Sequence, residues 1–250
     1  MINPWWRFNL HKSWYNGLMR KEPYGVDSVV HVIHRGTRGA SIVRDGEDKK
    51  RFLLMLAHFN DEHQPLNWFR DINDPRLLPF ERPDIWPEQN KLVHVIAFCL
   101  LNNHFHLLLK EIREGGISKF MQRLGTGMSY RYNLKYDEHG SLFQGSFRSR
   151  TVDNDNYLQY VVAYIQLKNA LDMYKGKISP ENDFENAYAW ACSYPYSSLG
   201  DHVGEFERPI IEKDLLADIF TPAEFKDFSK DFLEGRAQIS EDEKETVYFE

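Results

Sequence analysis

The chain has 250 residues, of which 42% are hydrophobic and 14% are aromatic. A chain of this length and composition can bury a substantial core, which excludes a disordered protein and predicts one domain, with or without extensions. The formal net charge of −6 at pH 7, taken as a single number, argues against a nucleic-acid partner.

The charge is distributed unevenly along the chain. Residues 201–250 hold 15 acidic residues against 6 basic ones, whereas residues 108–150 hold 8 basic residues against 4 acidic ones. The negative charge therefore belongs mainly to the C-terminal part. The central segment carries a positive excess and could hold a polyanion.

Cysteine usage and hydropathy indicate the compartment. Cys99 and Cys192 are the two cysteines, which is too few for a disulfide framework and fits a reducing cytoplasm. No apolar run reaches the roughly 20 residues that a membrane helix needs, and the N-terminal residues lack the pattern of a secretory signal. We expect a cytoplasmic protein with no membrane partner.

Apolar spacing and turn residues predict the first elements. Residues 1–27 are an N-terminal extension, and residues 29–36 form a strand. Residues 60–90, rich in Pro, Asp and Asn, are predicted to be an inserted loop. A helix is predicted between the strand and this loop, with Asp45 or Asp48 as its cap. Its apolar residues at helical spacing are Phe52, Leu53, Leu56 and Phe59.

The remaining elements complete an alternating order of strands and helices. Two strands are joined at the turn-prone residues 102 and 103, followed by a helix over 117–136, a strand over 141–152 and a third helix with an Asp or Asn cap. This order predicts an α+β fold, with one antiparallel sheet and helices on one face. The core is expected over residues 28–175, with a mostly helical, acidic extension over 176–250.

Two histidines interrupt an apolar strand in "FCLLNNHFHLLLKE", residues 98–111. Because side chains alternate across a strand, His104 and His106 project from the same face. Two imidazoles placed in this way can bind one metal ion. Such a pair can equally consist of half-buried histidines that are hydrogen-bonded to the backbone, so the spacing leaves both interpretations open.

A row of tyrosines follows on the third predicted helix. Tyr157, Tyr160 and Tyr164 recur at spacings of three and four, which places their hydroxyls along one edge of the helix. Tyrosine rows commonly pack in a core. A tyrosine hydroxyl is also a competent nucleophile toward phosphate when a cation stabilises the charge on the phosphoryl group.

Six motifs together resemble the REP-associated branch of the single-tyrosine transposases, which are HUH enzymes of the insertion-sequence type. The motifs are "HVIHRG", "NNHFHLLLKE", "ISKFMQRLGTGMSYRYN", "GSLFQGSFRSR", "YLQYVVAYIQLKNA" and "SYPYSSLGDHVG". They run in this order from about Val29 to Gly204, with the insertion over 60–90.

The resemblance implies a ferredoxin-like sheet and a metal-dependent enzyme that cleaves and joins single-stranded DNA. In this family a tyrosine attacks a phosphodiester, becomes linked to the 5′ phosphate and frees a 3′ hydroxyl. Carried over by motif, His104 and His106 are the metal ligands and Tyr164 is the nucleophile. The implied cofactor is Mg²⁺ or Mn²⁺, and the implied partner is single-stranded or hairpin DNA. The sequence leaves a homodimer open.

One position departs from the family pattern. Four residues after the nucleophile, relatives carry an amide that helps to bind the metal, but this chain has Lys168, and a protonated lysine cannot be a ligand. Asn169 is adjacent, yet in a regular helix it lies about 140° around the axis from Tyr164. Water, a shifted Asn169 or a direct contact of Lys168 with phosphate are the alternatives.

Basic residues around these motifs are candidates for contacts with DNA phosphates. They are Arg35 and Arg38 near two glycines, Lys119, Arg123, Arg131 and Lys135 on the second helix, and Arg148 and Arg150 on one face of the last strand. A solvated basic surface would carry the same residues.

Three functions stay open at this point. The sequence favours a metal-dependent single-strand endonuclease and transposase. The second is a nucleic-acid-binding protein without catalysis on the same scaffold, which Lys168 makes plausible. The third is a phosphate hydrolase that uses the histidines without a covalent tyrosine.

Overall fold

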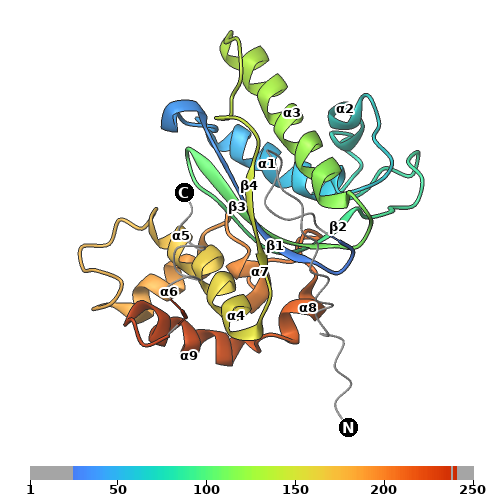
Figure 1. Ribbon diagram of the computed structural model, residues 1–250. Helices are drawn as coiled ribbons and strands as arrows, with labels where there is room; N and C mark the ends of the chain where they lie inside the picture. Colours follow the sequence, from blue (N-terminus) through green and yellow to red (C-terminus); the bar gives the residue numbers. More distant parts are fainter. Residues whose placement is uncertain (1–24, 238, 241–250) are drawn as a thin grey trace, which may run out of the picture.

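The structure, a computed structural model, describes residues 25–237, 239 and 240. The predicted N-terminal extension therefore lies almost entirely outside the described residues. A four-stranded antiparallel sheet forms the centre of the molecule, in the order β2-β3-β1-β4 (Figure 1). Its strands are β1 (Val29–Arg35), β2 (Val93–Leu100), β3 (His104–Glu111) and β4 (Arg148–Val152).

Helices connect the strands and continue beyond them. Those up to β4 are the single 3-10 turn η1 (Thr37–Gly39), α1 (Gly46–Phe59), α2 (Trp68–Ile72) and α3 (Gly116–Tyr136). After β4 come α4 (Asp155–Ala163), the π-helix η2 (Tyr164–Lys168) and α5 (Asn169–Leu171). The C-terminal part contains α6 (Phe184–Ser193), α7 (Leu199–Val203), α8 (Lys213–Ala217) and α9 (Pro222–Leu233).

The strand order and connectivity are those of a ferredoxin-like sheet, which confirms the predicted α+β class. Side chains that alternate along β3 serve two different layers. Phe105 packs against Phe52 of α1 with ring centroids 5.1 Å apart, whereas His106 faces Tyr164 at 5.5 Å. Strand β3 therefore contributes both to the core and to the opposite face.

The structure differs from the sequence prediction in where one helix lies. Helices α1 and α3 cover one face of the sheet, as a ferredoxin-like core requires, but α4 and the elements that follow it cover the other face (Figure 1). Because β2 and β3 are largely buried on both faces, alternation in the sequence could not assign each helix to a face.

The start of α1 and of α4 agrees with the capping predicted from the sequence. The side chain of Asp45 accepts a hydrogen bond from the backbone N–H of Asp48 at α1, and that of Asn154 accepts one from Tyr157 at α4. The last strand begins later than predicted. Residues 141–147 are irregular, and Gly145 has a φ of 131°, a conformation that interrupts a strand.

The C-terminal segment packs on the sheet and does not form a separate body. The backbone N–H of Glu212 donates to the carbonyl of Val95 on β2 (2.9 Å). Leu216 of α8 and Phe225 of α9 are fully buried. The predicted mostly helical character of this part is seen in α6 to α9, whereas the boundary near residue 175 stays a prediction. Among the described helices, none is long and apolar enough to cross a membrane.

The predicted loop over 60–90 is mostly irregular but contains α2, a short helix of five residues. Asn60 joins the end of α1 to the start of β2 and so spans the insertion. Its Nδ2 donates to the carbonyl of Val93 (2.8 Å), and its Oδ1 accepts from the N–H groups of Leu92 and Val93 (both 3.0 Å). The side chain is buried, so these backbone groups have no access to water.

We expect Asn60→Ala to lower the free energy of unfolding by about 2–4 kcal/mol, because it leaves buried backbone groups of residues 92 and 93 unsatisfied. Asn67→Ala is the matched control, since this exposed side chain makes no capping hydrogen bond and should change the value by less than about 0.5 kcal/mol. Urea unfolding followed by circular dichroism measures both. Equal midpoints for the two variants would contradict the role of Asn60.

Candidate active site

Residues of β1, β3 and β4 share the sheet face opposite α1 and α3. Cross-strand partners point to the same side of a sheet. His106 pairs with Ile33 of β1, and His104 pairs with Arg35. On β4, Arg148 and Arg150 pair with Ile33 and His31. The predicted histidines and these arginines therefore share one face.

The two predicted ligand histidines lie next to each other at this face. Their ring centroids are 5.0 Å apart at an interplanar angle of 74°, and both side chains are buried. Nδ1 of His104 donates to Oδ1 of Asn103 (2.7 Å), because an amide oxygen can only accept. In the neutral tautomer that makes this bond, Nε2 carries a lone pair, which is the form that a metal binds.

His31 of β1 contacts His106, the second of the two predicted ligands. Its Nε2 lies 2.9 Å from Nδ1 of His106, and the two rings stack with centroids 5.2 Å apart. When His106 uses Nε2 as a ligand, its Nδ1–H donates to His31. A partner on the second ring nitrogen is the usual support of a metal-binding histidine. The sequence analysis missed His31, although a histidine in the buried strand "VVHVIHR" was a signal.

Tyr164 completes the cluster from the helical side. Its ring contacts those of His106 and His31 edge to face, with centroids 5.5 Å and 6.1 Å apart. The side chain is only 1% exposed. The predicted nucleophile Tyr164 is therefore in contact with His106, a predicted ligand 58 positions earlier in the sequence.

A π-helix begins at Tyr164 and changes which residue lies one helical turn later on the same side of the helix. The backbone N–H of Asn169 donates to the carbonyl of Tyr164, the five-residue bond that defines a π-turn. This bond stacks Asn169 one turn above Tyr164, where residue 168 would lie in an α-helix. Lys168 instead turns outward, with a side chain 39% exposed that pairs with Asp172 (3.1 Å).

Asn169 is the best-fitting third ligand among the described residues. It is fully buried, and neither its Oδ1 nor its Nδ2 has a hydrogen-bond partner there. A buried amide without partners costs free energy, which a bound cation would recover. No cluster of three His, Cys, Asp or Glu suited to a metal occurs in the described ranges. Burial raises the pKa of the Cys99 thiol beside His106, which keeps the thiol protonated and a poor ligand.

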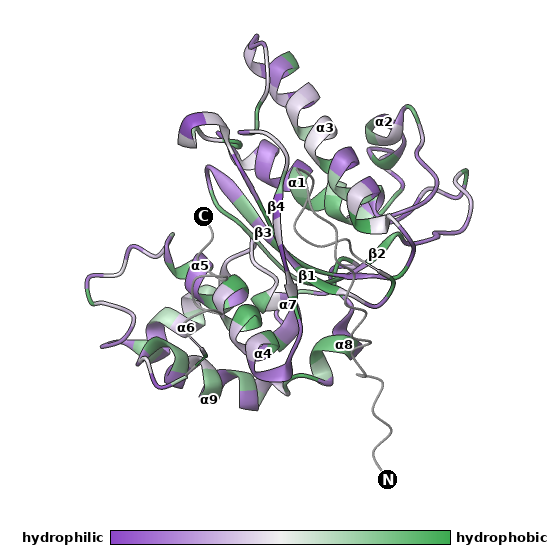
Figure 2. Ribbon diagram, in the orientation of Figure 1, coloured by the Kyte–Doolittle hydropathy of each residue, from purple (hydrophilic) through white to green (hydrophobic). Residues whose placement is uncertain are grey.

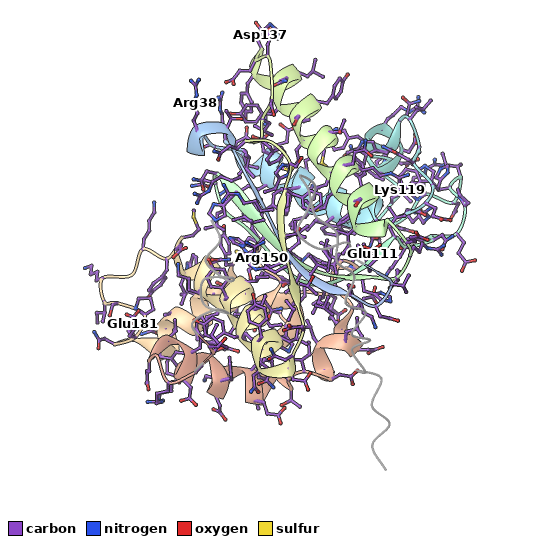
Figure 3. The ribbon with its side chains drawn as sticks, viewed as in Figure 1. Arg38, Glu111, Lys119, Asp137, Arg150 and Glu181 are labelled. Carbon is purple, nitrogen blue, oxygen red and sulfur yellow. The ribbon has the colours of Figure 1, made fainter. Side chains whose placement is uncertain are left out.

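The basic residues predicted to bind DNA fall into two groups. Arg35 lies at the rim of the site face, with Arg148 and Arg150 on β4, the strand that carries mostly hydrophilic colour in Figure 2. A pocket of about 90 Å³ beside Ile33 is lined by Arg35, Gln144, Ser146 and Arg148. In Figure 3, Arg150 lies near the centre of the view, and Arg38 on the loop after β1.

The basic residues of α3 belong to the other face of the sheet. Arg131 pairs with Glu47 of α1 (2.8 Å), and Lys135 pairs with Asp45 (2.7 Å). The hydrogen bond from Lys135, together with the backbone N–H of Asp48, lowers the pKa of Asp45 to about 2, so this pair stays ionised at neutral pH.

The other two basic side chains of α3 belong to the same helix, which covers the face of the sheet opposite the histidines (Figure 1). Arg123 donates to the carbonyls of Asp61 and Glu62, and Lys119 is labelled on α3 in Figure 3. The structure thus does not bring the α3 group, predicted to contact DNA, to the face that carries the histidines.

Comparison with known proteins gives one family match. Residues 88–168 match the family model described as "Transposase IS200 like". Over this segment the chain is similar to IS200-like transposases. The matched segment begins shortly before β2 and ends at the last residue of η2, so it includes both predicted ligand histidines and Tyr164. His31 and Asn169 lie outside it. The resemblance read from the motifs is confirmed at the level of this family, an enzyme class that acts on DNA.

Other comparisons add less. No curated protein matches in sequence. Among solved structures, one of a REP-associated tyrosine transposase bound to a REP hairpin is 11% identical to this chain, covers 79% of this chain and 94% of its own, and has a TM-score of 0.46.

Proposed function

We propose that the transposase domain cuts and joins single-stranded DNA through a covalent bond between Tyr164 and a 5′ phosphate. The observation that carries this proposal is the contact between Tyr164 and His106 on one buried face. The Tyr164 hydroxyl attacks the phosphorus atom, one P–O bond forms and one breaks, and the proton lost from tyrosine ends on the departing 3′ oxygen. The free energy of the cleaved bond is conserved for the later joining step, because one phosphodiester replaces another.

We also propose a divalent cation, Mg²⁺ or Mn²⁺, as the cofactor. His104, His106 and Asn169 would hold it, and their two nitrogens and one amide oxygen fit a hard or borderline ion. When bound, it stabilises negative charge on the phosphoryl oxygens. His31 and Asn103 orient the two imidazoles, and the ring contact of Tyr164 with His106 holds the tyrosine beside them.

The arginines on the site face are proposed to bind the DNA backbone. Arg148 and Arg150 lie across β1 from the two histidines, so a strand that reaches Tyr164 passes them. Arg35 borders His104, and Arg38 extends the same positive strip past the end of β1. Such phosphate contacts position DNA without reading its sequence. Single-stranded DNA with an adjoining hairpin, the partner that the family resemblance implies, is therefore the substrate class we propose.

The alternative of a binding protein without catalysis rested on Lys168. In the structure Lys168 is paired with Asp172 at the surface, and Asn169 takes the interior position. The departure from the family pattern therefore no longer favours loss of activity. Because Lys168 pairs with Asp172 at the surface, we do not assign it the catalytic role that the sequence suggested.

We expect Tyr164→Phe to eliminate a denaturant-resistant adduct with single-stranded hairpin DNA in Mg²⁺ or Mn²⁺, while DNA binding persists, because only the hydroxyl is removed. Tyr160→Phe is the matched control, since Tyr160 packs against Phe232 of α9, and should retain the adduct. Denaturing gels detect the adduct, and mass spectrometry should place it on residue 164. An adduct that survives in the Tyr164→Phe variant would refute this nucleophile.

We expect Asn169→Ala to weaken Mn²⁺ binding by about tenfold or more, whereas Lys168→Ala leaves the affinity within about twofold. The first change removes a proposed ligand, and the second removes only a surface ion pair. Electron paramagnetic resonance of free Mn²⁺ measures both without DNA or activity. Loss of affinity in Lys168→Ala alone would reverse the assignment of the two positions.

We expect Arg148→Gln and Arg150→Gln to weaken binding of single-stranded DNA and to lower the slope of log K against log salt by about 0.7 each. Arg131→Gln, whose side chain pairs with Glu47 on the other face, is the control and should leave the slope unchanged. Fluorescence anisotropy over a salt series provides the data. A drop in the slope for Arg131→Gln would return the α3 residues to the DNA path.

A further inference from the structure

The π-helix that selects Asn169 is tied to a distant part of the chain through Gln166. This residue lies within η2 and is fully buried. Its Nε2 donates to Oγ of Ser198 (3.1 Å), and its Oε1 accepts from Nδ1 of His202 (3.1 Å). Its backbone carbonyl accepts from Oγ of Ser197 (2.8 Å). All three partners belong to the motif "SYPYSSLGDHVG", to which no function has yet been assigned.

These partners are themselves fixed to the sheet. Oγ of Ser198 accepts from the backbone N–H of Phe98 (2.9 Å), and Ser197 forms an isolated bridge with Cys99 of β2. Cys99 is the cross-strand partner of His106. The motif therefore fixes Gln166 relative to β2, the strand that pairs with β3, on which His104 and His106 lie.

We propose that Gln166 is a positioning residue, and that its bonds to residues 197–202 hold the helix in the π register that places Asn169 rather than Lys168 above Tyr164. The proposal rests on the function proposed above and deepens it. A π-turn is rarer than an α-turn and needs compensation. A buried polar group left without a partner destabilises the fold, so the hydrogen bonds that satisfy Gln166 in this register can supply that compensation.

If the π-turn closed to an ordinary α-helical turn, Lys168 and Asn169 would exchange positions at the site. Closing the widened turn rotates the residues after Tyr164 by about 100° around the helix axis. Lys168 would then lie above Tyr164, where its charge repels a cation, and Asn169 would turn away. The change needs little rearrangement downstream, because α5 has only three residues and residues 174–183 contain no helix or strand.

The test combines a variant that removes the amide with one that moves an amide to position 168. Gln166→Leu keeps a similar volume and leaves Ser198 and His202 without this partner. We expect it to weaken Mn²⁺ binding at least about tenfold. In the double variant Gln166→Leu with Lys168→Asn, affinity should recover to within about threefold of the unmodified chain, because an α register brings residue 168 to the site.

A triple variant separates a change of register from simple loss of stability. Adding Asn169→Ala to the double variant should cost no further affinity, whereas Asn169→Ala in the otherwise unmodified chain should be weak. Lys168→Asn alone should bind as the unmodified chain does. Where Gln166→Leu fails to fold, Ser198→Ala replaces it in the same series, since it removes one bond to the amide. Circular dichroism establishes folding in each case.

The outcomes distinguish this proposal from the one on which it rests. Unchanged Mn²⁺ affinity in folded Gln166→Leu, or a double variant as weak as the single one, overturns the role of Gln166. Absence of Mn²⁺ binding in the unmodified chain, or unchanged affinity in Asn169→Ala, overturns the proposed metal site instead.

Discussion

The alternation of side chains along β3 is the constraint on which the site depends. Phe105 must face α1, because its ring packs there with Phe52, and this contact fixes both neighbours, His104 and His106, on the opposite face. A slip by one residue would bury the histidines among the rings of the core. Packing energy on one side of the sheet therefore determines where the nitrogens of the two proposed ligand histidines lie on the other.

The sequence predicted the parts of the site that lie within single elements. The spacing of His104 and His106 sufficed to place them on one face, and the family resemblance identified Tyr164. His31 could not be found in this way, because it lies 75 positions from His106 and the pairing of β1 with β3 is a tertiary fact. The basic residues of α3 were misplaced for the same reason, since their acidic partners lie on α1.

The register after Tyr164 was the hardest feature to predict. Helical spacing assumes 3.6 residues per turn, which assigns the interior position to Lys168 and gives the wrong residue. The π-turn is supported by Ser197, Ser198 and His202, about 30 positions later in the chain. A local pattern cannot contain this information. The buried, unpartnered amide of Asn169 shows the consequence only once the packing is known.

The donor set proposed for the cation has a further physical consequence. Two neutral imidazoles and one amide contribute no negative charge, in contrast to the carboxylates that dominate tight magnesium and calcium sites. The protein therefore leaves the charge of a divalent ion largely uncompensated. On the proposed function, a DNA phosphate brought to Tyr164 by the arginines of β4 would supply that charge. Because coupling between two ligands is reciprocal, cation and DNA would each strengthen the binding of the other, and the proposed site would be complete only with the substrate present.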